Sequence, residues 1–152
     1  MLIGPPDAIE DGLWVGPEPR TPEAFRMLAD LGVQDILSLL PEEESRASGV
    51  HPTVAFRIAS GLGMAHHRCP IDDFSSRSMR SKLPEAVELL TSLRERGRRV
   101  YVHCAVGQNR SPTVVAAYLK ATRNLDGNSA CEEVMRLHPC RPDIDAVRMF
   151  KP

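Results

Sequence analysis

The chain has 152 residues, of which 42% are hydrophobic and 26% are charged, and its formal net charge is −1. This length and composition fit one globular domain over residues 1–152 with an ordinary hydrophobic core. The balanced charge excludes a global field that would recruit nucleic acid or an anionic membrane, so any affinity for phosphate must be local. No apolar run in the sequence approaches the length of a membrane span.

The cysteines and the N-terminus indicate the cellular setting. Four cysteines are present, without the spacing of a disulfide framework or the CxxC pairs of a zinc site. The first residues lack the basic and apolar pattern of a signal peptide. We therefore expect a monomer in a reducing, cytoplasmic setting, with no metal and no cofactor.

The first third of the chain reads as alternating strand and helix. A Pro/Gly-containing lead-in over 1–12 precedes a short apolar strand over 12–16, in which Trp14 is expected in the core. Thr21, Pro22 and Glu23 are typical of a helix start, and apolar residues at helical spacing continue to Gly32. An apolar strand is then expected over 35–40, and this succession favours an α/β sheet.

The middle of the chain is less clearly patterned. Acidic residues over 41–44 suggest the solvated first turn of a short helix, and 45–63 is ambiguous, with a possible strand over 54–58. A further strand is expected over 64–71. Its neighbours His66 and His67 would point to opposite faces, which argues against a joint metal site.

A polar segment and an amphipathic helix come next. The basic segment over 75–82 is interpreted as a solvated loop and helix start, although it could also border a site for acidic substrates. Apolar residues at helical spacing predict a helix over 84–96, which Gly97 ends.

The stretch over 100–112 carries the chemistry. An apolar strand over 100–102 leads into a loop centred on Gly107, and Ser111-Pro112 opens an apolar helix over 113–119. Such a loop directs several backbone N–H groups to one spot, where the helix dipole adds positive potential. This arrangement suits a dianionic phosphate.

Three side chains at this loop complete the prediction. The positive potential favours the thiolate of Cys104, which is the nucleophilic form of the side chain. The planar fork of Arg110 can hold two phosphate oxygens. Ser111 can donate a hydrogen bond to the sulfur and help it leave. Of the four cysteines, only Cys104 is followed by arginine at this offset, and an arginine at a helix start opposes the dipole, which favours a functional role.

The motif His103-Cys104-x-x-Gly107-x-x-Arg110-Ser111 resembles the signature of the cysteine-based protein tyrosine and dual-specificity phosphatases. The segment over 9–16, the helix predicted from Asp126 to Leu137, the Arg-Pro at 141–142 and a last helical stretch to Phe150 are also similar to the family. The family's long phosphotyrosine-recognition segments are not recognisable, which indicates the compact dual-specificity type.

The resemblance implies a central sheet of four or five mostly parallel strands with helices on both faces, and a site at the carboxyl ends of the strands. It implies that Cys104 is the nucleophile and that Arg110 binds phosphate together with the N–H groups of Ala105, Val106, Gly107, Gln108 and Asn109. His103 would brace the loop and tune the thiol.

The resemblance also implies a general acid about thirty residues before the cysteine. Asp72 lies 32 residues before Cys104 and is favoured for this role, with the adjacent Asp73 as the alternative. Both are also ordinary turn residues, which leaves the assignment open.

The predicted substrates are phosphotyrosine and also phosphoserine or phosphothreonine in proteins. Two alternatives stay open. The same chemistry could act on RNA 5′-phosphates, phosphoinositides or phosphoglucans, because a fold does not determine a substrate. A non-catalytic phosphate-binding module is the other, although such modules usually lack the cysteine or the arginine.

Overall fold

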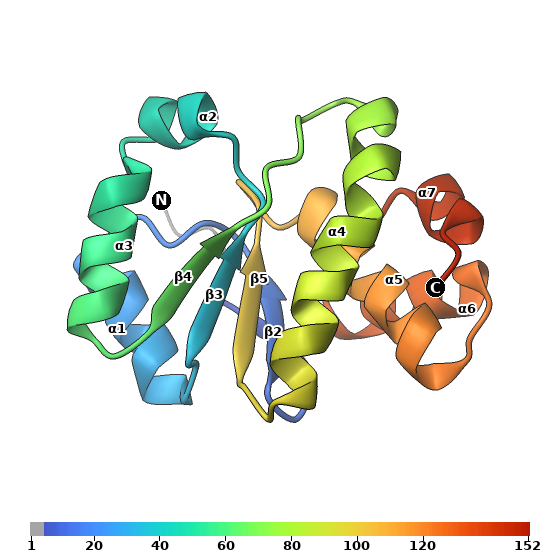
Figure 1. Cartoon of the computed structure of the whole chain (residues 1–152), viewed down its shortest axis with the longest axis horizontal. Helices are drawn as coiled ribbons and strands as arrows, with labels where there is room; N and C mark the ends of the chain where they lie inside the picture. Colours follow the sequence, from blue (N-terminus) through green and yellow to red (C-terminus); the bar gives the residue numbers. More distant parts are fainter. Residues whose placement is uncertain (1–4) are drawn as a thin grey trace.

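A five-stranded sheet in the order β1-β2-β5-β3-β4 lies at the centre of the computed structural model, which describes residues 5–152 (Figure 1). Strands β2, β5, β3 and β4 are parallel to one another, whereas β1 pairs antiparallel with β2. The predicted α/β fold with a mostly parallel sheet is confirmed. The strands are β1 (Asp7–Glu10), β2 (Leu13–Gly16), β3 (Asp35–Ser38), β4 (Ala65–Arg68) and β5 (Val100–His103).

Helices cover both faces of this sheet, as predicted. One face carries α1 (Pro22–Leu31) and α3 (Pro52–Gly61), and the short α2 (Glu42–Ala47) follows the carboxyl end of β3 (Figure 1). The other face carries α4, α5, α6 and α7. Their bounds are α4 (Ser76–Glu95), α5 (Arg110–Arg123), α6 (Gly127–Leu137) and α7 (Ile144–Met149).

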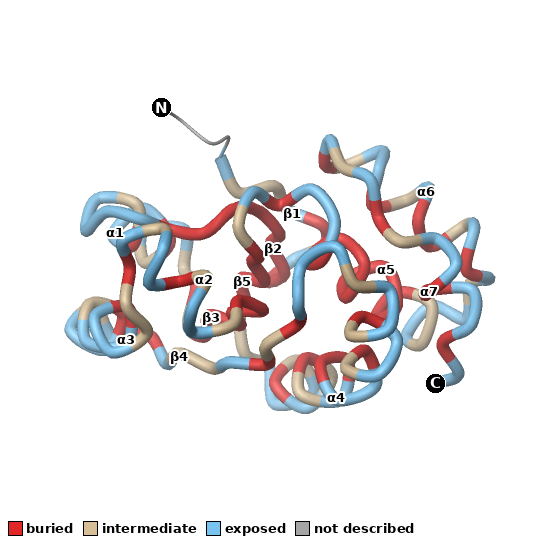
Figure 2. The backbone as a smooth tube through the Cα atoms, turned by 90° about the horizontal axis from the view of Figure 1, so that it is seen from above, coloured by how far each residue is buried: buried red, intermediate tan, exposed pale blue. Residues whose placement is uncertain are grey.

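The alternation of strand side chains produces two separate hydrophobic clusters. In β5, Val100 and Val102 pack in the cluster under α4 and α5, whereas Tyr101 packs in the cluster with α1 and α3. Trp14 of β2 packs in the same cluster as Tyr101 and is in the core, as expected. The Arg99 guanidinium lies 5.2 Å from the centroid of its ring. Burial is therefore densest along the central strands (Figure 2).

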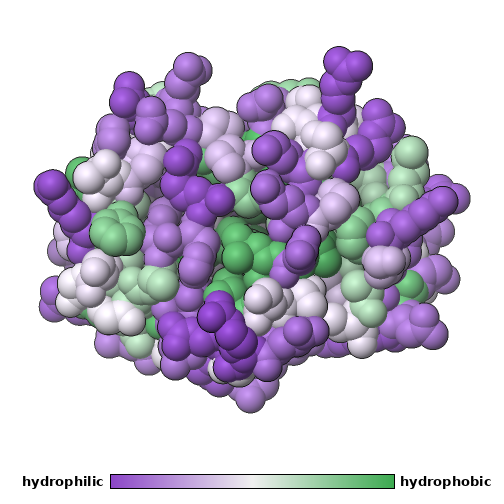
Figure 3. Space-filling view, viewed as in Figure 1, coloured by the Kyte–Doolittle hydropathy of each residue, from purple (hydrophilic) through white to green (hydrophobic). Residues whose placement is uncertain are grey.

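The surface is mostly polar. In the view of Figure 3, hydrophilic side chains dominate the face, and apolar side chains gather in a band near its centre. None of the helices within residues 5–152 is long and apolar enough to cross a membrane.

The first difference from the sequence expectations is a strand in the predicted lead-in. Residues 7–10 form β1, which turns at Gly12 and pairs with β2. The burial of its side chains alternates only weakly along the strand, because β1 lies at the edge of the sheet. A four-residue edge strand leaves little periodicity in the sequence, so the pattern alone missed it.

The second difference is that the strand considered over 54–58 is wrong. These residues belong to α3, whose first turn is capped by His51 Nδ1 accepting from the Thr53 N–H at 3.1 Å. Pro52 fits the first helical position. Ala55 and Ala59 are four residues apart and are both buried, so the face that packs consists of small residues and gave a weak apolar signal.

The third difference is the length of α4. It begins at Ser76 rather than at Pro84, because Ser75 accepts a hydrogen bond from the Ser78 N–H at 3.1 Å and caps the helix there. Pro84 lies inside the helix, where it lacks only the one backbone N–H. The basic segment over 75–82 is thus mostly helical.

Asp35 at the start of β3 suggests a test of the fold. Its buried carboxylate accepts from Arg98 Nε at 2.6 Å and contacts His67 Nε2 at 2.8 Å. Asp35→Ala should lower the free energy of unfolding by about 2 kcal/mol, because it removes the acceptor that the Arg98 guanidinium and the His67 ring share. Urea denaturation measures this, with the exposed Asp30→Ala in α1 as the control. Equal midpoints for the two variants would contradict the prediction.

Candidate active site

The predicted loop lies at the carboxyl end of β5, between its parallel neighbours β2 and β3. β5 ends at His103, and the buried Cys104 follows with 2% of its surface exposed. Helix α5 begins at Arg110, three residues before the predicted start at 113. Arg110 and Ser111 are therefore in its first turn, which places the Ser111 hydroxyl beside the Cys104 thiol.

Gly107 is required for the shape of this loop. Its φ is +73°, in the left-handed region that favours glycine. A Cβ at this position would lie 2.7 Å from the carbonyl carbon of Gly16, the last residue of β2. Both the backbone conformation and the close approach to β2 therefore exclude a side chain.

The backbone N–H groups of the loop are free. Within the described part of the chain, those of Ala105, Val106, Gly107, Gln108, Asn109 and Arg110 donate no hydrogen bond to another protein group. Free N–H groups clustered at a helix N-terminus bind anions through direct donation and through the helix dipole. The predicted phosphate-binding residues thus form the loop that joins Cys104 to α5, with their N–H groups unpaired among the described residues.

Ser111 and His103 contact Cys104 from two sides. The Ser111 hydroxyl lies 3.2 Å from the Cys104 sulfur. His103 Nδ1 lies 3.0 Å from the Cys104 carbonyl oxygen, which only accepts, so Nδ1 donates. Burial lowers the pKa of His103 to about 3. The ring is therefore neutral near pH 7, and its position suits bracing the loop rather than supplying a proton.

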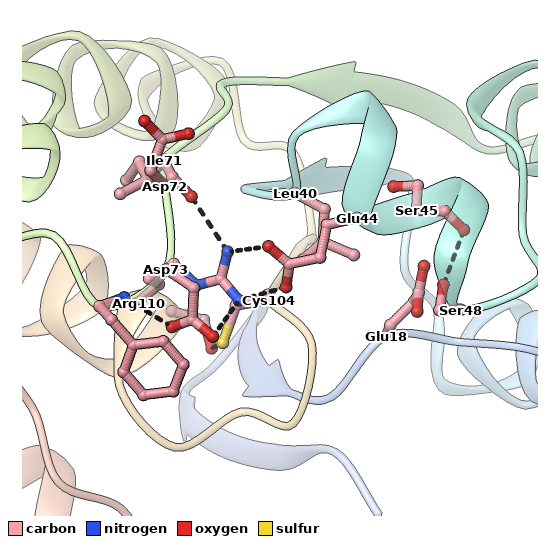
Figure 4. A network of polar contacts seen from close by, with 12 residues as sticks. Glu18, Leu40, Glu44, Ser45, Ser48, Ile71, Asp72, Asp73, Cys104 and Arg110 are labelled. Carbon is pink, nitrogen blue, oxygen red and sulfur yellow. Dashed lines mark hydrogen bonds and ion pairs between the residues drawn. The ribbon is translucent and has the colours of Figure 1, made fainter.

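Arg110 is almost fully buried, and its guanidinium is held from several segments (Figure 4). Glu44 of α2 accepts from Nη1 at 2.9 Å and from Nη2 at 2.6 Å, and the Ile71 carbonyl accepts a second bond from Nη1 at 3.0 Å. Burial opposes the charge, but Glu44, Cys104 and Asp73 outweigh it and hold the pKa of Arg110 above its usual value.

These contacts leave one edge of the guanidinium for a ligand. Arginine has five N–H groups, and Glu44 and Ile71 use both of those on Nη1 and one on Nη2. The Nε–H and the second Nη2–H make no hydrogen bond within residues 5–152, and together they form a parallel fork of the kind that binds two phosphate oxygens, with the Asp73 carboxylate 3.5 Å from Nη2. Glu44 therefore fixes the orientation of this fork without occupying it.

The two candidate acids lie differently. The Asp73 carboxylate is 3.5 Å from Arg110 Nη2, and Figure 4 shows it directed toward Arg110 and Cys104. Asp72 points away from them in the same view, and its backbone N–H donates to the Ser78 hydroxyl at 2.9 Å. The structure thus brings Asp73, rather than Asp72, to the loop. The choice of acid stays a prediction.

No group of three or more His, Cys, Asp or Glu side chains positioned to hold a metal ion occurs among residues 5–152. His66 and His67 do not act together: His67 contacts Asp35, while burial lowers the pKa of His66 to about 4.

Comparison with known proteins agrees with this geometry. Residues 18–146 match the model of the dual specificity phosphatase catalytic domain. The chain belongs to the dual specificity phosphatase family.

Two relatives match much of this chain. The chain is 30% identical over 139 residues to the chloroplastic phosphoglucan phosphatase LSF1 of Arabidopsis thaliana, covering 91% of this chain and 24% of that protein. It is 30% identical over 118 residues to laforin of Mus musculus, covering 70% of this chain and 36% of laforin. The chain thus spans about a quarter to a third of these relatives' length.

Solved structures share the fold. PTPMT1 in complex with PI(5)P superposes with a TM-score of 0.79 at 22% identity, covering 94% of this chain and 92% of that one. The active form of Tk-PTP gives a TM-score of 0.77 at 22% identity, with coverage of 93% and 90%.

Sequence reasoning missed several residues that position this phosphatase loop. Glu44 was interpreted only as part of a solvated acidic turn, and His138 was not singled out. His138 Nε2 lies 2.6 Å from the Gly107 carbonyl oxygen, and its Nδ1 lies 2.6 Å from Asp7. The contact of Glu44 with Arg110 and that of His138 with Gly107 have no local sequence signal, because the partners are separated by tens of residues.

Glu44 provides a test of the site geometry. Glu44→Gln should lower kcat/KM by about 10- to 100-fold, because the guanidinium loses its charged partner and its fixed orientation. The exposed Glu43→Gln in the same turn is the matched control and should leave kcat/KM unchanged. A Glu44 variant with the control's kinetics would show that Arg110 is oriented without it.

Proposed function

We propose that this domain hydrolyses phosphate monoesters, with phosphotyrosine and also phosphoserine or phosphothreonine in proteins as substrates, through a phosphocysteine intermediate. The observation that carries the proposal is the run of free backbone N–H groups between Cys104 and α5, next to the fork of Arg110 that Glu44 leaves unbonded. The family membership of residues 18–146 supports it.

In the first step, the Cys104 thiolate attacks phosphorus in line with the ester oxygen. The loop N–H groups and Arg110 hold the three non-bridging oxygens, where negative charge is spread in the transition state. The bond from phosphorus to the ester oxygen breaks, and an aspartic acid protonates the leaving oxygen. The products of this step are the free alcohol and a phosphocysteine.

In the second step, water attacks the phosphocysteine. The same aspartate, now ionised, takes the proton from the water, and the bond between phosphorus and sulfur breaks. The Ser111 hydroxyl, 3.2 Å from the sulfur, can donate to the departing thiolate. Inorganic phosphate leaves, and the site returns to its first state.

The aspartic acid is one of two neighbours. The 32-residue spacing supports Asp72, whereas the position of the Asp73 carboxylate beside Arg110 supports Asp73. A proton donor must reach the leaving oxygen directly, so geometry weighs more than spacing. We therefore take Asp73 forward as the first candidate and keep Asp72 as the second.

A second candidate function keeps this chemistry with a non-protein substrate. The names of relatives favour it: one is a phosphoglucan phosphatase, and the PTPMT1 structure holds PI(5)P. An RNA 5′-phosphate belongs to the same class. A panel of phosphopeptides, phosphoinositides, phosphoglucan and RNA 5′-phosphate, compared by kcat/KM, separates these substrates. A reducing compartment such as the cytoplasm and a monomeric state remain the expected setting.

The nucleophile is tested by Cys104→Ser. A serine hydroxyl at this position has no base to activate it, so hydrolysis of an aryl phosphate should fall by at least about 10³-fold while binding of the substrate persists. Cys131→Ser, in the core away from the loop, is the control. Substantial turnover by the Cys104 variant would contradict the role of Cys104 as the nucleophile, and a wild type that binds the substrate without turnover would favour the non-catalytic alternative.

Metal independence is tested with chelation and with Arg110→Lys. EDTA should leave the rate unchanged, because backbone N–H groups and Arg110 supply the positive potential. Arg110→Lys keeps the charge but loses the fork, and should cost about 10²–10³-fold in kcat/KM. Loss of activity on chelation that added Mg²⁺ or Mn²⁺ restores would contradict this mechanism.

The general acid is tested with two single variants and two leaving groups. The true acid changed to Asn should lose about 10²-fold on phosphotyrosine, but much less on an aryl phosphate whose acidic phenol departs without a proton. Its rate should also lose the alkaline fall that marks deprotonation of the acid. Asp73→Asn is expected to behave in this way and Asp72→Asn to resemble wild type. The reverse result would return the role to Asp72.

A further inference from the structure

Four carbonyl oxygens of the active-site loop are held from outside the loop. His103 Nδ1 contacts the Cys104 carbonyl at 3.0 Å, and the Glu18 N–H donates to the Ala105 carbonyl at 3.0 Å. The Arg141 N–H donates to the Gln108 carbonyl at 2.7 Å. The fourth, the Gly107 carbonyl, contacts His138 Nε2 at 2.6 Å.

Each of these contacts determines the direction of one N–H group. In a planar trans peptide the C=O and the following N–H point in opposite directions. A carbonyl held outward therefore turns the N–H of the next residue inward. The Gly107 carbonyl sets the direction of the Gln108 N–H, and glycine is the residue whose backbone rotates most easily. This peptide is thus the one that most needs an external anchor.

The anchor at Gly107 differs from the others, because it is a histidine whose second ring nitrogen contacts a carboxylate. His138 follows α6 and is buried, and its Nδ1 lies 2.6 Å from the Asp7 carboxylate on β1. A carbonyl oxygen and a carboxylate both only accept. Both ring nitrogens must therefore donate, which requires the imidazolium form of His138.

We propose that His138, held as an imidazolium by Asp7, is a positioning residue that keeps the Gly107–Gln108 peptide turned so that its N–H faces the bound oxyanion. The proposal rests on the proposed phosphatase function of the loop. When the ring loses a proton, one nitrogen presents a lone pair to an acceptor. With the proton kept on Nδ1, that acceptor is the Gly107 carbonyl, and the peptide is then free to rotate.

The other titratable groups around this pair do not change charge near neutral pH. Burial raises the pKa of Cys140 and of Cys131 to about 11. Burial also raises the pKa of Tyr101, which faces Asp7 from β5. Arg141 is permanently charged. Since His103 has a pKa near 3, the change in His138 is separable from its neighbours.

The test measures binding of tungstate, a tetrahedral oxyanion, by titration calorimetry. All proteins carry Cys104→Ser, so that titration of the thiol does not contribute. His138→Leu fills the space without a donor and should weaken binding roughly tenfold at about pH 6.5, the loss of one charge-assisted hydrogen bond. His138→Gln, whose amide can replace Nε2–H, should bind within about threefold of the parent. His67→Leu, the same change in the other His–Asp pair, is the control and should bind like the parent.

The pH dependence separates positioning from packing. Alkaline pH should weaken the affinity of the parent, because only the doubly protonated ring donates to both acceptors, whereas the affinity of His138→Gln should not change. Asp7→Asn is a second, milder variant: the neutral ring can then accept from the amide and donate to Gly107, so its affinity should also be flat. Equal affinity of His138→Leu and the parent, or the same alkaline loss in His138→Gln, would overturn the proposal.

The wild-type enzyme distinguishes this failure from a failure of the proposed function. If wild type hydrolyses an aryl phosphate and the parent binds tungstate, but His138→Leu binds equally well, only the positioning role is wrong. If wild type does neither, the loop is not a phosphatase site, and the inference fails with it.

Discussion

The buried charge of Arg110 is the constraint on which the rest of the site depends. A guanidinium with 2% of its surface exposed is costly unless it is paired and hydrogen-bonded. Its partners come from α2 and from the segment after β4, whereas Arg110 itself begins α5. Satisfying this one charge therefore joins three segments at the carboxyl edge of the sheet, where the loop after β5 also lies.

The same partners also orient the guanidinium of Arg110. Glu44 and the Ile71 carbonyl occupy one edge and one corner of the guanidinium, so the remaining fork has a single orientation. A flexible arginine would lose conformational entropy on each binding event, whereas this one is already ordered. The ion pair that stabilises Arg110 thus also orients the fork that we propose binds phosphate, which explains why a carboxylate lies beside this group.

The loop N–H groups obey a complementary constraint. They point inward only while the carbonyl oxygens of the same peptides accept hydrogen bonds from outside the loop. The groups that contact these oxygens come from the segment after β2, from β5 and from the segment after α6. Gly107 is pressed against Gly16 with no room for a Cβ. An anion site made of backbone therefore needs the surrounding fold to be complete, even though its sequence motif is only nine residues long.

The sequence by itself determined the family, the class of fold and the residues proposed for the chemistry. Cys104, Gly107, Arg110 and Ser111 are adjacent in the chain, so their relation is local and readable, and the strand and helix around them have clear apolar periods. The tertiary structure decided which residues that are distant in the sequence contact one another. Glu44 meets Arg110 across 66 residues, and His138 meets Gly107 across 31. It also turned Asp73, and not Asp72, toward the loop, because that direction depends on the Ser78 contact at the start of α4. Helix α3 and strand β1 were missed for a related reason: small residues and short edge strands carry weak periodicity, and their stability comes from the packing of the assembled sheet.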